Sequence, residues 1–158
     1  MASWKQVLTN GSMIANVGSA PSNAGEVNAG ARLITDLYGT APAGTAGNVV
    51  SLGATAPSNV GASSTAAARQ GMIFIVTDAG SGDELLLEGV VRLSSTTTTA
   101  LLPNTAKKGT PVYMSTTAGA VTSTAPSTSG DFVRRVGHVI DATNRTIYWR
   151  PSIDWSFV

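Results

Sequence analysis

Apolar and polar positions alternate most clearly in the second half of the chain. Residues 72–77 read Met-Ile-Phe-Ile-Val-Thr, a run of β-branched and aromatic side chains that is typical of a strand. A short loop with two glycines follows at 78–83, and residues 84–87 resume the apolar run. This order predicts a β-hairpin, because glycines supply the positive φ angles that short connections need. Residues 89–93 predict a further strand.

At least three more strands are predicted after residue 107. Residues 111–115 and 120–123 flank a turn at 118–119, and Lys-Lys-Gly at 107–109 forms another turn. Residues 132–140 and 146–150 predict a second hairpin. In the loop between them, Asp141 can bond the turn backbone and Asn144 tolerates a positive φ angle.

The period of two along a strand assigns side chains to faces in this second hairpin. Ile147 and Trp149 are expected to face one way, and Tyr148 and Arg150 the other. In the preceding strand, one face is expected to carry Phe132, Arg134, Val136, His138 and Ile140, and the opposite face Val133, Arg135 and Val139. The two neighbouring arginines therefore do not form one basic patch.

The first 70 residues have a different character. Glycine and proline recur at a density that breaks any long helix or strand. Apolar islands at 13–14, 33–34, 37–38 and 49–52 argue against full disorder. Residues 31–38 fit either a short helix or a strand. We expect a mainly β chain, in which an extended, interlocking arm (residues 1–70) precedes a compact antiparallel β-sandwich or barrel-like module (residues 71–158).

Composition adds that the surface is poor in charge. Only 12% of the 158 residues are charged and the net charge is +1, whereas about 25% is usual. Close to half of the residues are Ala, Gly, Ser or Thr, which bury little apolar area each. Since isolated soluble domains generally carry more surface charge, we expect partner proteins to cover much of this surface.

Several function classes are disfavoured by residues that the chain lacks. It has no cysteine, which excludes disulfides and thiolate metal sites, and its one histidine leaves no His-rich ligand set. There is no apolar run of about 18 residues and no secretory signal pattern at the start. Scattered Lys and Arg argue against nucleic-acid binding. We therefore expect no cofactor, no metal, no nucleic acid and no membrane partner.

No catalytic constellation stands out either. His138 and Asp141 are close in sequence, but no Gly-x-Ser-x-Gly elbow accompanies them, and a packed or half-exposed strand histidine is the favoured interpretation. Asp83 and Glu84 are adjacent and would point apart on a strand. Trp149 is expected to fill the core. We expect no enzyme and no catalytic residues; the candidate interface residues are Trp4, Tyr38, Arg134, Arg135, Arg150, Trp155, Phe157 and Val158.

The C-terminal block carries a resemblance. Gly109-x-Pro-Val-Tyr-x-Ser, Arg134-x-Val-Gly-x-Val-Ile-Asp and Ile147-Tyr-Trp-x-Pro-Ser-x-Asp-Trp together resemble a β module of tailed-phage virion proteins. Similar segments occur in head decoration (cement) proteins and in tail-fibre or appendage proteins. The opening Met-Ala-Ser-Trp-Lys-Gln-Val also resembles the starts of some phage structural proteins.

This resemblance implies a non-enzymatic structural protein of a bacteriophage virion, assembled in the cytoplasm of the bacterial host. The first expectation is a capsid decoration or cement protein that clamps the shell and stabilises the head. Its partners would be the major capsid protein and copies of itself, in a symmetric homo-oligomer such as a trimer. The alternative is a tail fibre, spike or other tail appendage. A carbohydrate-binding β-sandwich is the third interpretation.

Overall fold

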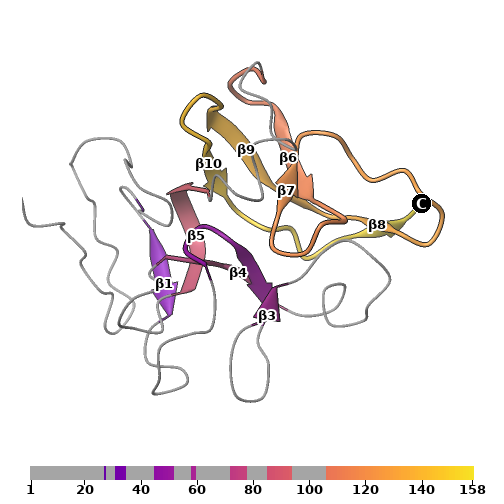
Figure 1. The fold of residues 1–158 in the computed structure, drawn as a ribbon, viewed down its shortest axis with the longest axis horizontal. Helices are drawn as coiled ribbons and strands as arrows, with labels where there is room; N and C mark the ends of the chain where they lie inside the picture. Colours follow the sequence, from indigo (N-terminus) through magenta and orange to yellow (C-terminus); the bar gives the residue numbers. More distant parts are fainter. Residues whose placement is uncertain are drawn as a thin grey trace, which may run out of the picture.

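The computed structural model describes Val27 and residues 31–34, 45–51, 58–59, 72–77, 85–93 and 106–158. Within these ranges the regular elements are all strands, and the predicted mainly β class is confirmed. The strands are β1 (Arg32–Ile34), β2 (Val49–Ser51), β3 (Ser58–Asn59), β4 (Ile73–Val76), β5 (Leu85–Arg92), β6 (Pro111–Met114), β7 (Val121–Thr122), β8 (Phe132–Val133), β9 (Arg135–Asp141), β10 (Thr146–Trp149) and β11 (Ser156–Phe157) (Figure 1).

One antiparallel sheet nearly closes into a barrel. Its strands follow the order β3-β2-β4-β5-β10-β9-β6-β7, and β1 pairs with β5 outside this path. The amide of Val49 in β2 donates a hydrogen bond of 2.9 Å to the carbonyl of Gly119, in the turn between β6 and β7. This bond brings the two ends of the sheet together. Strands β8 and β11 form a separate two-stranded sheet beside the C-terminus (Figure 1).

The longest strand, β5, connects the two halves of the sheet. Its residues Leu85 and Leu86 pair with β4, and its residues 89–92 pair with β10. At Gly89 the pairing with β10 begins. This residue has a φ of +148°, and a Cβ there would lie 2.8 Å from the Cα of Ala31. The separate strands predicted at 84–87 and 89–93 are therefore wrong. They form one strand, because glycine lets the backbone bend without breaking its pairing.

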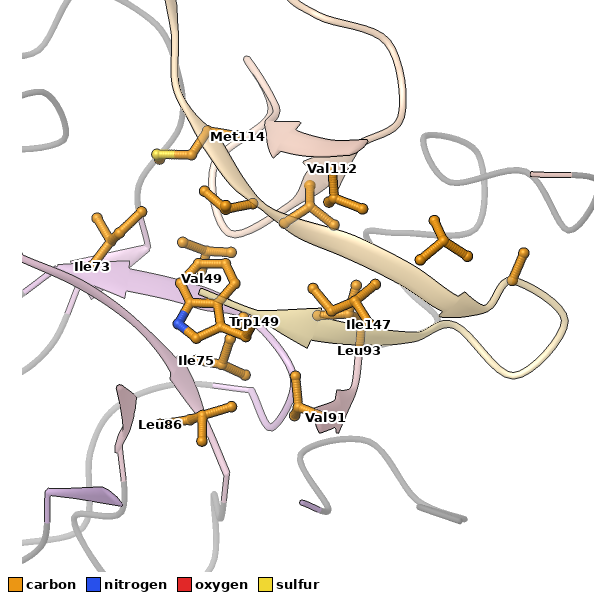
Figure 2. Close-up of a cluster of buried hydrophobic side chains, with 14 of the residues drawn as sticks. Val49, Ile73, Ile75, Leu86, Val91, Leu93, Val112, Met114, Ile147 and Trp149 are labelled. Atoms are coloured by element: carbon orange, nitrogen blue, oxygen red, sulfur yellow. The ribbon is translucent and has the colours of Figure 1, made fainter. Parts of the chain in front are cut away.

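The core lies between the two halves of the sheet. Trp149 of β10 is fully buried, and Figure 2 shows its indole among aliphatic side chains from β2, β4 and β5. Ile147 is also fully buried, whereas Tyr148 is half-buried and Arg150 is exposed. The alternation predicted for this strand, with Trp149 filling the core, is confirmed.

Strand β9 does not follow the predicted alternation, because two β-bulges shift its phase. Pairing with β6 skips Val136, and pairing with β10 skips Ile140. Val139 consequently joins Val136 in the core, while Ile140 is 42% exposed and His138 is half-buried. The prediction that Val136, His138 and Ile140 share a face is wrong. The predicted strand 132–140 is also divided, into β8 and β9, at Arg134.

Parts of the first 70 residues belong to the same sheet. The undecided segment 31–38 contains strand β1, which pairs with β5. Strand β2 pairs with β3 and β4 and contributes the fully buried Val49 and Val50. The sheet thus continues across the boundary predicted at residue 70. The rest of the predicted arm lies outside the described residues.

The turns are largely as predicted. Residues 108–109 and 118–119 form turns, and the carboxylate of Asp141 accepts hydrogen bonds from the Asn144 amide (3.3 Å) and side-chain Nδ2 (2.7 Å). These bonds from Asn144 lower the pKa of Asp141. The positive φ expected at Asn144 occurs instead at Arg145, at 53°.

Gly137 gives a test of how closely β9 and β10 approach. A Cβ there would collide with the Tyr148 carbonyl oxygen, so Gly137→Ala should lower the free energy of unfolding by about 3 kcal/mol or more. Gly130→Ala is the control, because Gly130 has a positive φ of 92° but no atom within 4 Å of the added Cβ. It should cost about 1–2 kcal/mol. Equal costs in urea unfolding would contradict the close approach.

Candidate functional site

The segment after β10, residues 150–158, presents apolar side chains on a fixed backbone. It holds three of the five large apolar side chains that are exposed in the described part of the chain: Ile153 (88%), Phe157 (55%) and Val158 (45%). Its backbone is tied to the sheet by hydrogen bonds from the Ser152 amide to the Arg135 carbonyl (2.9 Å) and from the Val158 amide to the Asp131 carbonyl (3.0 Å). The side chains are therefore exposed although the backbone is held.

Trp155 links this segment to the core. Its ring packs edge-to-face on the buried Phe132, with ring centroids 6.2 Å apart, and on Phe157 at 5.1 Å. Such pairs contribute about 0.5–1.5 kcal/mol each beyond the burial of their area. Trp155 therefore packs within its own chain, and Phe157 continues the aromatic cluster to the surface.

Two hollows flank the segment. The Trp155 hollow has a volume of about 420 Å³ and is lined by Tyr113, Val133, Arg135, Ser152, Asp154, Trp155 and Ser156. The Glu88 pocket has a volume of about 240 Å³ and is lined by Arg32, Met72, Ile73, Leu87, Glu88, Arg134, Arg150, Pro151 and Ile153. The segment contributes to both linings, with residues 152 and 154–156 at the Trp155 hollow and residues 150, 151 and 153 at the Glu88 pocket. The segment and its two hollows together are the candidate interaction surface.

The Glu88 carboxylate organises the charges of its pocket. It accepts a hydrogen bond of 2.5 Å from the Tyr148 hydroxyl, and this bond raises the pKa of Tyr148. The guanidinium groups of Arg150 and Arg32 lie 3.6 and 3.9 Å from it. Both arginine side chains are more than half exposed, so each ion pair stabilises the fold by only about 0–1 kcal/mol.

Sheet register explains why these side chains meet. Arg32 of β1 pairs directly with Glu88 of β5, and Trp149 of β10 pairs with the next residue, Gly89. Arg150 follows Trp149 and so reaches the same place. The pocket therefore forms where β1 and β10 approach β5.

Arg134 has a positioning role. It is 5% exposed, and its Nε donates a hydrogen bond of 2.8 Å to the Ser152 carbonyl. Burial lowers the pKa of its guanidinium group, because a low-dielectric surrounding disfavours the charged form. Together with the bond from the Ser152 amide to the Arg135 carbonyl, this contact engages both the N–H and the C=O of Ser152.

The structure separates the predicted interface residues into groups. Trp4 and Tyr38 lie outside the described residues. The remaining six lie along the described surface: Arg135 and Trp155 at the Trp155 hollow, Arg134 and Arg150 at the Glu88 pocket, and Phe157 and Val158 on the exposed side of the terminal segment. Sequence reasoning missed Arg32, Met72, Glu88 and Ile153. Arg32 and Glu88 meet only through the register of β1 and β5.

His138 and Asp141, the residues weighed for catalysis in the sequence, both lie within the described ranges. His138 is half-buried on β9, and the Asp141 carboxylate is engaged by Asn144. Within the part of the chain that is described, no three His, Asp or Glu side chains gather closely enough to hold a metal ion. Nor does this part contain a helix long and apolar enough to cross a membrane.

Comparison with known proteins gives no match among family models, curated proteins or solved structures. The surface around residues 150–158 is therefore the basis for the function proposed below.

The Glu88–Tyr148 bond predicts a pH effect. Glu88→Gln should lower the pKa of Tyr148 toward the usual value of about 10, because the charged acceptor raises it. A folded pKa above the unfolded one means that the contact stabilises the fold below about pH 10 and that this stabilisation is lost as the pH rises through the folded pKa. Tyrosine ring signals in an NMR titration measure this. Asp154→Asn, which removes a carboxylate from the other hollow, should leave the Tyr148 titration unchanged; an equal effect of both variants would contradict the assignment.

Proposed function

We propose that this chain is a non-enzymatic structural protein of a tailed-phage virion, a capsid decoration or cement protein that clamps the shell. The observation that carries the proposal is the surface around residues 150–158. There a hydrogen-bonded backbone presents Ile153, Phe157 and Val158 to solvent, beside two hollows that contain arginines. Exposed large apolar side chains with charged side chains nearby are typical of a protein-binding surface.

The mechanism is mechanical. Phe157 and Ile153 lose their remaining contact with water when the surface docks on the major capsid protein, which contributes about 1–2 kcal/mol for each side chain. Arg135 and Arg150 at the rim attract carboxylates on the shell and fix the orientation of docking. Each contact is weak. Copies of the chain that also bind one another, for example around a symmetry axis, make the attachment multivalent and long-lived.

Reconstitution on heads tests this proposal. Purified full-length chain is added to expanded heads that lack it, and cryo-electron microscopy counts and locates the bound copies. A decoration protein should occupy lattice positions of the shell in matching numbers and raise the temperature at which the heads rupture. A few copies per virion, located on the tail, would overturn the proposal in favour of a tail appendage.

The apolar surface predicts which side chains carry the attachment. The double variant Ile153→Ser/Phe157→Ser should bind heads at least tenfold more weakly, because truncating central apolar anchors removes most of the binding energy. Ile140→Ser is the matched control, since Ile140 is 42% exposed on the bulge of β9. It should bind within about twofold of the unchanged chain in a co-sedimentation titration. Equal weakening by the control would contradict the location of the surface.

A further inference from the structure

The Glu88 pocket holds more positive than negative charge. Three arginines and one glutamate line it, which leaves a net charge of +2 among its lining residues (3 − 1). The one carboxylate is shared: Glu88 bonds the Tyr148 hydroxyl and lies 3.6 Å and 3.9 Å from Arg150 and Arg32. Strong bidentate pairs between arginine and a carboxylate need about 2.7–2.9 Å. Neither arginine therefore obtains such a pair from Glu88, and both side chains are more than half exposed.

The wall of the pocket is apolar. Met72 is 59% exposed and Ile153 is 88% exposed, and Leu87 and Pro151 complete the lining. A simple inorganic anion would use the arginines but gain nothing from this wall. The pocket therefore suits a group that carries a carboxylate next to an apolar side chain.

Size restricts the occupant further. The volume of about 240 Å³ is below the roughly 300–1,000 Å³ that is usual for pockets of drug-sized ligands. It fits one or two side chains of a peptide. Ile153, one of the exposed apolar side chains of residues 150–158, belongs to its lining.

We propose that the Glu88 pocket binds an Asp or Glu side chain of a partner protein, together with a neighbouring apolar residue. The incoming carboxylate bridges Arg32 and Arg150, and the apolar residue contacts Met72 and Ile153. Glu88 holds the two arginines in place and is itself fixed by Tyr148, but it also repels the incoming carboxylate. The identification of the partner as the shell protein rests on the proposed function. The preference for a carboxylate is independent of it, because it follows from the pocket alone.

A peptide titration of the full-length chain tests the pocket. The probes are acetyl-Leu-Glu-Leu-amide and its neutral counterpart acetyl-Leu-Gln-Leu-amide, and the readout is the NMR signal of the Nε–H groups of Arg32 and Arg150. The Glu peptide should shift both signals in a saturable way, and the Gln peptide should not. This comparison uses the unchanged chain, so it does not depend on the folding of any variant. Equal responses to the two peptides would overturn the proposal.

Substitutions in the pocket should change the affinity for the Glu peptide in opposite directions. Arg32→Gln and Arg150→Gln should each weaken binding of the Glu peptide about two- to fivefold, as expected for exposed ion pairs. Glu88→Gln should strengthen it by a similar factor, because it removes the repulsive charge and keeps an oxygen for the Tyr148 hydroxyl. Lys107→Gln is the control, since it removes one positive charge from an exposed residue that lines neither hollow, and it should leave the affinity unchanged. Weaker or unchanged binding by Glu88→Gln would overturn the bridging arrangement.

A parallel titration with inorganic phosphate distinguishes a peptide-binding site from a general anion-binding site. Inorganic phosphate should bind more weakly than the Glu peptide, and Ile153→Ser should weaken the peptide alone. If phosphate binds as tightly and Ile153→Ser has no effect, the pocket is an anion site and the proposal is wrong. Head binding without a response to the Glu peptide overturns the pocket only, whereas a peptide response without head binding overturns the proposed function only.

Discussion

The change of partners along β5 is the constraint on which the rest of the structure depends. Its first half pairs with β4 and β1, and its second half pairs with β10. Gly89 permits this change, because a side chain there would collide with the backbone at Ala31. The same junction brings β4 and β10 around one core with Trp149 at its centre (Figure 2), and it places Glu88 between Arg32 and Arg150. Fold and pocket thus have a common origin.

The terminal segment shows how a chain poor in charge can present a defined surface. Its side chains are exposed, but its backbone is fixed by Ser152, by Val158 and by the pairing of β11 with β8. The Nε of Arg134 donates a hydrogen bond to the Ser152 carbonyl, so this arginine supports the surface from within. Its neighbour Arg135 is exposed to solvent. A surface ordered before binding loses less conformational entropy when a partner docks.

Local patterns predicted much of this fold. Some features depend only on residues that are close in sequence, and the sequence predicts them: the turns at 108–109 and 118–119, the Asp141 turn and the alternation in β10. The bulges at Val136 and Ile140 depend on how β9 pairs with two different strands, so a strict period of two misplaced His138 and Val139. The pocket was out of reach for the same reason: Arg32 and Glu88 are partners only through register across β1 and β5, which a single sequence does not encode in any local signal.

The bond between Val49 and Gly119 joins two parts of the chain that are far apart in sequence. These residues are 70 positions apart (119 − 49). The residues of β2 are therefore synthesised well before the turn between β6 and β7 to which Val49 is hydrogen-bonded. Loop-closure entropy delays contacts of such separation, and chains dominated by them fold in milliseconds to seconds. Until β6 and β7 are made, the core residues of β2 and β4 lack the apolar side chains of Val112, Met114 and Val121 that pack in the same cluster, and incompletely packed intermediates are prone to aggregate. The contact between β2 and the β6–β7 turn therefore has a second consequence: it completes the cover of apolar residues that would otherwise be available to neighbouring chains.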